Sequence, residues 1–140
     1  PIEGKIIPLS QVEDDAFSQE VLGKGIAIIP SEGKVYAPFD GTVITLFPTK
    51  HAIGIVSDNG CEVLIHIGMN TVQLNGKYFT SHVQQGDKVK KRQLLVEFDI
   101  DHILQEGYNL ETPVIITNTK DYSNINTNTN KDNVVLVAEA

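Results

Sequence analysis

The chain has 140 residues, of which 41% are hydrophobic and 21% are charged, a composition typical of one globular domain. Eleven Lys and Arg residues against eighteen Asp and Glu residues give a net charge of −7, which argues against nucleic-acid binding and adsorption to anionic membranes. The one cysteine, Cys61, excludes an internal disulfide and a cysteine-rich zinc site, and no apolar run reaches the ~20 residues of a membrane-spanning helix.

The chain begins at Pro1 rather than Met, so it is expected to be a processed product or a piece of a longer protein. No signal peptide opens it, and a lone thiol fits a reducing compartment. We therefore expect a cytoplasmic domain without direct membrane insertion.

Short runs of β-branched and aromatic residues, separated by Gly, Pro, Asn and Asp, dominate the first 118 residues. This pattern predicts strands at residues 25–29, 34–37, 42–47, 51–57, 61–67, 71–74, 88–89, 94–99 and 113–117. Short helical turns are expected only at residues 14–22 and 100–107. A parallel α/β sheet would need crossover helices that the sequence lacks, so we predict an all-β sandwich or barrel.

The polar, nearly repetitive segment 119–133 has too little apolar surface to bury and is predicted to be a flexible loop. The apolar run that begins at Val134 predicts a final edge strand at residues 134–138. Because 140 residues suit one domain and leave little room for two, residues 1–140 are predicted to form a single domain.

Residues 49–68 predict two strands joined by an Asn-Gly-type hairpin turn. A two-residue turn places His51 and His66 on one face of the hairpin, with their Cβ atoms about 5–8 Å apart, whether it centres on residues 59–60 or 58–59. A three-residue loop would place the two histidines on opposite faces. Thr49 lies two residues before His51, on the side from which it can orient the His51 ring.

Such a pair suits more than one chemistry. A neutral imidazole can act as a nucleophile while its neighbour donates a hydrogen bond to the anion formed, as a transient phosphohistidine requires. The same two rings could bind zinc, which normally takes three or four protein ligands, or they could be ordinary strand residues. His82 and His102 match no catalytic motif and are interpreted as structural or solvated.

Motifs of one family cover nearly the whole chain: Gly23-Lys-Gly-Ile-Ala-Ile, Val35-Tyr-Ala-Pro-Phe-Asp-Gly-Thr-Val, Thr49-Lys-His51-Ala-Ile-Gly, Leu64-Ile-His66-Ile-Gly-Met-Asn-Thr-Val-Gln-Leu-Asn-Gly, Gly86-Asp-Lys-Val and Thr112-Pro-Val-Ile-Ile-Thr-Asn. In these motifs the chain resembles enzyme IIA of the glucose family of the bacterial phosphoenolpyruvate:sugar phosphotransferase system, especially the IIA domains of β-glucoside and sucrose permeases. The fifteen-residue spacing of the two histidines matches that family.

The resemblance implies an antiparallel β-sandwich with barrel-like closure and one or two short helical turns. It implies that His66 accepts a phosphoryl group on Nε2 from phospho-HPr and passes it to a cysteine of a IIB domain, which phosphorylates the incoming sugar. His51 would hydrogen-bond the phosphoryl oxygens, and Thr49 would hold His51 in the required tautomer. No cofactor and no metal are expected.

The resemblance also implies an apolar, partner-binding ring around the site, although its members could equally belong to the core. The matching residues are Phe17, Val21, Leu22, Phe39 and Phe47. Asn70 stands where many members have Asp, and Arg92 where Gly is usual. The domain is expected either to stand alone or to be fused to a IIBC permease, which would tether it to the inner face of the cell membrane.

Three other functional classes share single features with the chain. A biotinyl or lipoyl carrier would need a lysine flanked by methionines, but the single methionine, Met69, has no adjacent lysine. A zinc endopeptidase of related architecture would need a His-x-His element, which does not occur. A non-catalytic regulatory module could bind its partner through the same histidine face. Such a module would lose partner binding when it is phosphorylated.

Overall fold

The computed structural model describes residues 2, 4–9, 12, 24–118, 124–127 and 136–139. The predicted helical turn at residues 14–22 lies outside these residues, and so do Phe17, Val21 and Leu22. The described elements are β1 (Gly4–Pro8), β2 (Lys24–Pro30), β3 (Lys34–Tyr36), β4 (Gly41–Leu46), β5 (Ala52–Ser57), β6 (Glu62–His66), the 3₁₀ helix η2 (Thr71–Leu74), β7 (Phe79–Ser81), β8 (Lys88–Val89), β9 (Leu94–Phe98), α2 (Ile100–Gln105), β10 (Thr112–Ile116), β11 (Asn124–Thr127) and β12 (Leu136–Glu139).

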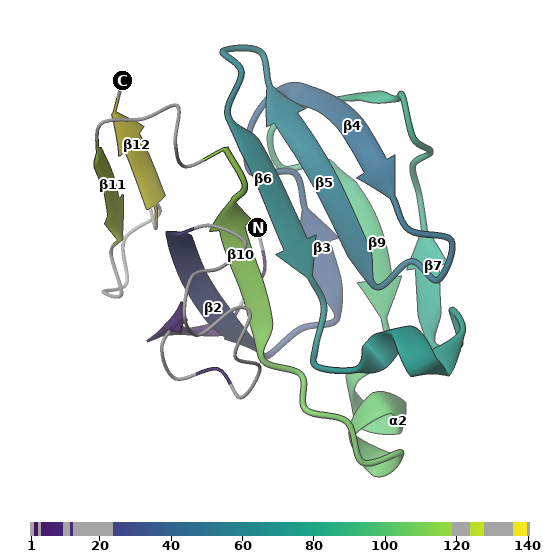
Figure 1. Cartoon of the computed structure of the whole chain (residues 1–140). Helices are drawn as coiled ribbons and strands as arrows, with labels where there is room; N and C mark the ends of the chain where they lie inside the picture. The colour runs from purple at the N-terminus through teal and green to yellow at the C-terminus, as the bar shows by residue number, and fades with distance from the viewer. Residues whose placement is uncertain are drawn as a thin grey trace.

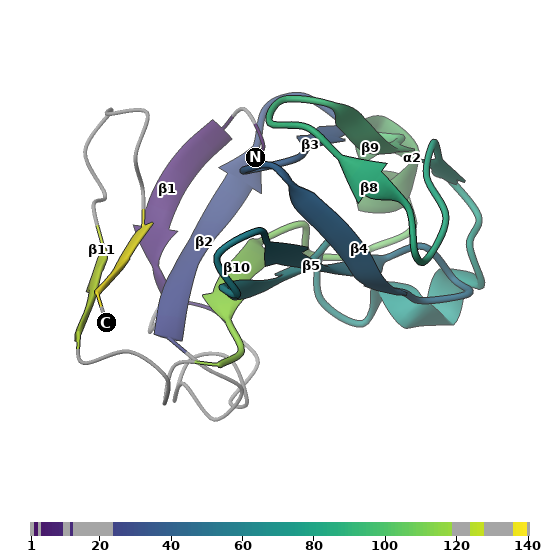
Figure 2. The same ribbon diagram turned by 90° about the horizontal axis from the view of Figure 1, so that it is seen from above.

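Two antiparallel sheets pack face to face in a β-sandwich (Figure 1). The larger sheet has seven strands in the order β1-β2-β10-β6-β5-β4-β8, and the smaller has three in the order β3-β9-β7. Figure 2 shows from above how β3 and β9 cover one face of β4 and β5. The predicted barrel-like closure is not observed: among the described strands, the larger sheet ends at β1 and at the two-residue strand β8, and no ladder joins it to the smaller sheet.

The core lies between the two sheets and is built from the apolar runs that predict the strands. Ile53 and Ile65 of the larger sheet cluster with Val35 and Val96 of the smaller one, and all four are fully buried. Each such side chain contributes about 1.5–3 kcal/mol by leaving water. Strand β10 is buried along its whole length because Ile115 joins a second cluster on the opposite face of the larger sheet.

Eight of the nine strands predicted for residues 25–117 are confirmed to within one residue at each end, and the predicted turn at residues 100–107 is helix α2. The strand predicted at residues 71–74 is wrong, because this segment is η2. It is flanked by Asn70 and Asn75 with φ of 60° and 54°, left-handed conformations that asparagine tolerates and that interrupt a strand. Strands β1 and β7 were not predicted.

The C-terminal part differs in detail from its prediction. Inside the predicted loop 119–133, Asn124–Thr127 forms strand β11, which pairs antiparallel with β12; β12 covers Leu136–Glu139 rather than residues 134–138. Backbone ladder bonds satisfy polar main-chain groups whatever the side chains are, so a polar composition does not by itself prevent pairing. Within the described part of the chain, no helix has the length and apolar character needed to cross a membrane.

Candidate functional site

His51 and His66 lie side by side at the end of the β5–β6 hairpin where β5 begins and β6 ends. Their ring centroids are 4.9 Å apart and their planes are inclined by 82°. The hairpin has a three-residue loop at residues 58–60, because the Ser57 N–H donates to the Cys61 carbonyl oxygen at 2.8 Å. Neither two-residue turn considered for the sequence is formed.

The prediction that a three-residue loop separates the two histidines is nevertheless wrong. His66 pairs with Ala52, so strict alternation along an extended strand would put His51 on the other face. His51 precedes β5, however, and Lys50 immediately before it has a φ of 61°. The turn is closed by the Phe47 N–H, which donates to the Ala52 carbonyl oxygen at 3.2 Å. This turn reorients His51 and brings its ring against His66.

The tautomer of His66 follows from its hydrogen bond. Its Nδ1 lies 2.8 Å from the Gly68 carbonyl oxygen, which can only accept, so Nδ1 carries the proton. In the neutral ring the lone pair therefore resides on Nε2. Because His66 is only partly buried, this is the histidine of the pair that a reactant in solution can approach.

His51 is the buried member of the pair. Its side chain is only 3% exposed, and its Nδ1 lies 2.6 Å from the Thr49 hydroxyl oxygen. Burial, and secondarily the neighbouring His66, lower the pKa of His51 from 6.5 to about 4. His51 is therefore neutral at physiological pH and has one N–H to donate. The predicted contact between Thr49 and His51 is present in the structure.

Of the two predicted partner-binding residues that the structure describes, only Phe47 reaches the histidines. Its ring is 39% exposed and contacts His51 edge-on, with centroids 5.4 Å apart. Phe39 precedes β4, whose first residue, Gly41, pairs at the far end of the ladder from His51. The length of β4 separates the two ends by about 16 Å. Phe39 packs against the core, the alternative considered for it.

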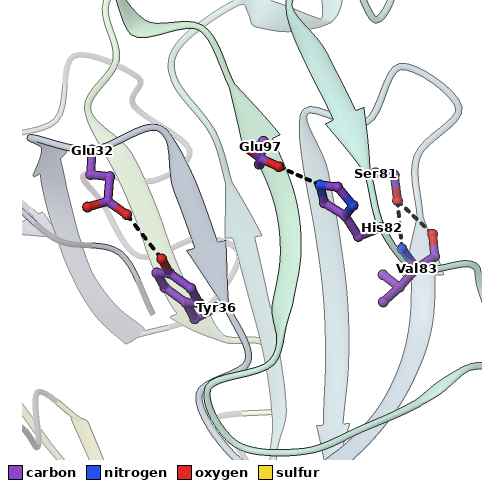
Figure 3. A network of polar contacts seen from close by, with 6 residues as sticks. All are labelled: Glu32, Tyr36, Ser81, His82, Val83 and Glu97. Atoms are coloured by element: carbon purple, nitrogen blue, oxygen red, sulfur yellow. Dashed lines mark hydrogen bonds and ion pairs between the residues drawn. The ribbon is translucent and has the colours of Figure 1, made fainter.

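The other two described histidines are paired with carboxylates elsewhere. His82 Nε2 lies 2.7 Å from Glu97 Oε1, and His102 Nδ1 lies 2.6 Å from Asp99 Oδ2. Figure 3 draws the contact between His82 and Glu97. Both carboxylates line a shallow cleft of about 690 Å³ beside the smaller sheet, to which neither histidine of the pair contributes. Hydrogen bonds from the His102 backbone and ring lower the pKa of Asp99, as expected for a helix N-cap.

A metal centre at the pair would need further ligands. Among the described residues, no group of three or more His, Cys, Asp and Glu side chains is placed to hold a metal ion. A zinc ion bound at the histidine pair would therefore have two imidazole ligands and, within the described residues, no third side-chain ligand.

Two residues of the site were given no role by the sequence. Gly68 supplies the carbonyl that fixes the His66 tautomer, and the fully buried Thr71 donates its hydroxyl to the Ile67 carbonyl oxygen. The only signal for Gly68 in the sequence is a glycine directly after a strand, which indicates a positive φ. Thr71 carries no signal beyond its place in the His66 motif.

Replacing Gly68 with alanine is expected to lower the free energy of unfolding by about 2–4 kcal/mol. The φ of Gly68 is +76°, and a Cβ there would lie 2.7 Å from Thr71 Cγ2 and 2.9 Å from the Asn109 carbonyl oxygen, so strain and overpacking add. Gly86→Ala is the matched control, because its φ is +95° but no atom lies within 4 Å of the added Cβ. Urea denaturation should show the larger loss at Gly68; equal losses would contradict the tight packing described for it.

The comparisons with known proteins agree with this site. Residues 1–122 match the family described as phosphoenolpyruvate-dependent sugar phosphotransferase system, EIIA 1. The PTS system beta-glucoside-specific EIIBCA component of Halalkalibacterium halodurans is 54% identical over 125 residues, 89% of this chain and 20% of that protein. The component of the same name from Bacillus subtilis is 54% identical over 123 residues, 88% of this chain and 20% of that protein.

A solved structure agrees with the fold as well. Glucose permease IIA from Mycoplasma capricolum matches with a TM-score of 0.80 and 41% identity, over 84% of this chain and 76% of that chain. The chain spans about a fifth of the length of the curated relatives it matches. By its matched family and its relatives, the chain belongs to the EIIA family of the phosphoenolpyruvate-dependent sugar phosphotransferase system.

Proposed function

We propose that this domain is a phosphocarrier in which His66 accepts a phosphoryl group on Nε2 from phospho-HPr and passes it to a cysteine of a IIB domain. The observation that carries the proposal is the histidine pair itself. A partly exposed His66, with its lone pair on Nε2, lies 4.9 Å from a buried, neutral His51. Family membership supports the same reading.

Each transfer exchanges one bond to phosphorus for another. The Nε2 lone pair of His66 attacks phosphorus in line, the bond from phosphorus to the donor breaks, and the donor keeps the electron pair. In the second transfer the IIB thiolate attacks and the bond to Nε2 breaks, so His66 regains its lone pair. The bond from Nδ1–H to the Gly68 carbonyl keeps the ring oriented in both steps.

His51 is proposed to stabilise the phosphoryl group with a neutral donor. In the proposed tautomer the Thr49 hydroxyl, 2.6 Å from Nδ1, donates to that nitrogen, and the His51 proton on Nε2 is donated to a phosphoryl oxygen. A neutral donor stabilises the transferring charge without holding the dianion as a salt bridge would. That balance suits a carrier, since the group must leave as readily as it arrives.

Exposed apolar side chains support docking of partner proteins over the pair. Phe47 contacts His51 and is 39% exposed, and Val72 of η2, six residues after His66, is 47% exposed. Exposed apolar side chains near a reactive group are a feature of protein-interaction surfaces. Phe17, Val21 and Leu22 stay predicted members of this surface, while Phe39 packs against the core at the other end of β4.

The relatives named EIIBCA components suggest the setting of the domain. We propose that it works in the cytoplasm next to a IIB domain, as part of a permease whose membrane domain selects the sugar. Joining this domain and the IIB domain in one polypeptide would raise the effective concentration of the IIB cysteine at His66.

The proposal is tested by intact-mass spectrometry after incubation with phosphoenolpyruvate, enzyme I and HPr. The expected result is a gain of one phosphate, which acid and hydroxylamine remove, as a phosphohistidine requires. Omitting HPr should prevent the gain. If active partners add no phosphate to the folded domain, the carrier function is rejected.

A further inference from the structure

The loop from Ile67 to Thr71 fixes the reactive nitrogen of His66, and its backbone needs outside support. Gly68 has a φ of +76° and Asn70 a φ of 60°, so two of its residues occupy the left-handed region. Such conformations persist only where neighbouring groups hold them. The direction of the Gly68 carbonyl, and with it the tautomer of His66, depends on those neighbours.

Besides the bond between the His66 ring and the Gly68 carbonyl, further hydrogen bonds restrain residues 67–69 of this loop. The Met69 N–H donates to the Asn109 carbonyl oxygen at 2.8 Å, and the Ile67 N–H donates to the His51 carbonyl oxygen at 2.7 Å. A further bond comes from a side chain: the Thr71 hydroxyl donates to the Ile67 carbonyl oxygen. That carbonyl belongs to the same peptide group as the Gly68 N–H, so the bond restrains the peptide plane that leads into Gly68.

Thr71 also packs against the glycine it restrains. It is fully buried, and its Cγ2 lies 2.7 Å from the place where a Cβ on Gly68 would be. A buried hydroxyl that lost its acceptor would cost about 1–3 kcal/mol, so the bond to Ile67 is strongly favoured over alternatives. Its hydroxyl and its methyl group thus act on two consecutive residues of one loop.

We propose that Thr71 is a positioning residue for phosphoryl transfer: it holds the Ile67–Gly68 peptide so that the Gly68 carbonyl keeps the proton of His66 on Nδ1 and the lone pair on Nε2. This inference rests on the proposed carrier function of His66. Thr71 itself touches neither phosphorus nor a partner protein. An imidazole released from the Gly68 carbonyl would shift towards the tautomer protonated on Nε2, and that nitrogen then has no lone pair with which to attack phosphorus.

Thr71→Val tests the proposal, because it removes the hydroxyl and keeps the shape. Thr112→Val is a matched control: Thr112 is also fully buried and donates to a carbonyl, that of Leu110 at 2.9 Å, on strand β10 beside β6. Thr71→Ser should restore what Thr71→Val loses. If the valine variant does not fold, Thr71→Ala removes the hydroxyl without placing a second methyl group against Ile67.

The first readout is the ¹⁵N chemical shifts of the His66 ring in the unphosphorylated domain at pH 8. Wild type, Thr112→Val and Thr71→Ser should show the proton on Nδ1, whereas Thr71→Val should show a mixture or the other tautomer. The second readout is the rate of acceptance from phospho-HPr. It should fall by about ten- to a hundredfold in Thr71→Val, in kcat rather than in KM.

A Thr71→Val domain that keeps the Nδ1 proton and the wild-type rate would overturn the proposal. So would an equal change in Thr112→Val, because it would assign the effect to general loosening. The tautomer measurement needs no phosphoryl transfer, so its outcome is separate from that of the carrier function. A wild-type domain that is never phosphorylated rejects the carrier function, and the ring shifts still decide whether Thr71 sets the tautomer.

Discussion

His66→Ala is expected to accept no phosphate at all, whereas His51→Gln is expected to accept phosphate and to pass it on about a hundredfold more slowly. The two histidines differ in access: His66 is partly exposed with its lone pair on Nε2, while His51 is buried and engaged by Thr49. Only the first can attack phosphorus. Loss of one preorganised donor to a developing anion typically costs a factor of 10²–10³ in rate.

The measurement separates the two half-reactions in a rapid-quench experiment. Acceptance is followed from phospho-HPr to the domain, and transfer from the isolated phospho-domain to a IIB domain. His82→Gln is the control, because His82 is an exposed histidine paired with Glu97 outside the pair, and both of its rates should match wild type. Transfer by His51→Gln at the wild-type rate would refute the supporting role of His51, and a labelled His66→Ala would place the acceptor elsewhere.

The strand pattern could be predicted because it depends on local chemistry. Runs of β-branched and apolar residues end at Pro, Gly and Asn, and the same apolar side chains, such as Ile53 and Ile65, fill the core between the sheets. The error at residues 71–74 has a local cause as well. Thr-Val-Gln-Leu has strand composition, but the left-handed asparagines on either side turn it into η2.

The histidine pair was predicted, but the reason for its formation was not. An argument from alternation requires both residues to lie in regular strands, and His51 lies in the turn before β5. The φ of 61° at Lys50 decides where the ring points, and nothing in a lysine signals a left-handed backbone. The prediction that the two histidines lie together therefore rested on the resemblance to the family. Strand alternation across the observed three-residue loop would have placed the two rings on opposite faces.

The groups that complete the site are mainly backbone groups, and a sequence does not display their directions. The carbonyl of Gly68 sets the tautomer of His66, and the hydroxyl of Thr71 is bonded to another carbonyl. Composition identifies which side chains can react. It does not show which peptide groups orient them, so these partners emerge only from the folded loop.

The burial of His51 should make the stability of the domain depend on pH. Its pKa is about 4 in the folded state, against about 6.5 in an unfolded chain. Between these values the unfolded chain binds more protons, so the free energy of unfolding rises with pH and falls as the solution is acidified. From pH 7.5 to pH 4.5 the contribution of His51 to this loss is expected to be about 2 kcal/mol.

Urea denaturation of wild type and His51→Gln at both pH values isolates this contribution, because the other titrating groups are common to the two proteins. The variant should lose about 2 kcal/mol less than wild type on acidification. Between pH 7.5 and pH 8.5, where His51 is neutral in both states, the two proteins should change alike. An identical loss in both proteins at pH 4.5 would mean that the folded site accepts a charged His51, and the neutral donor proposed for the phosphoryl group would have to be abandoned.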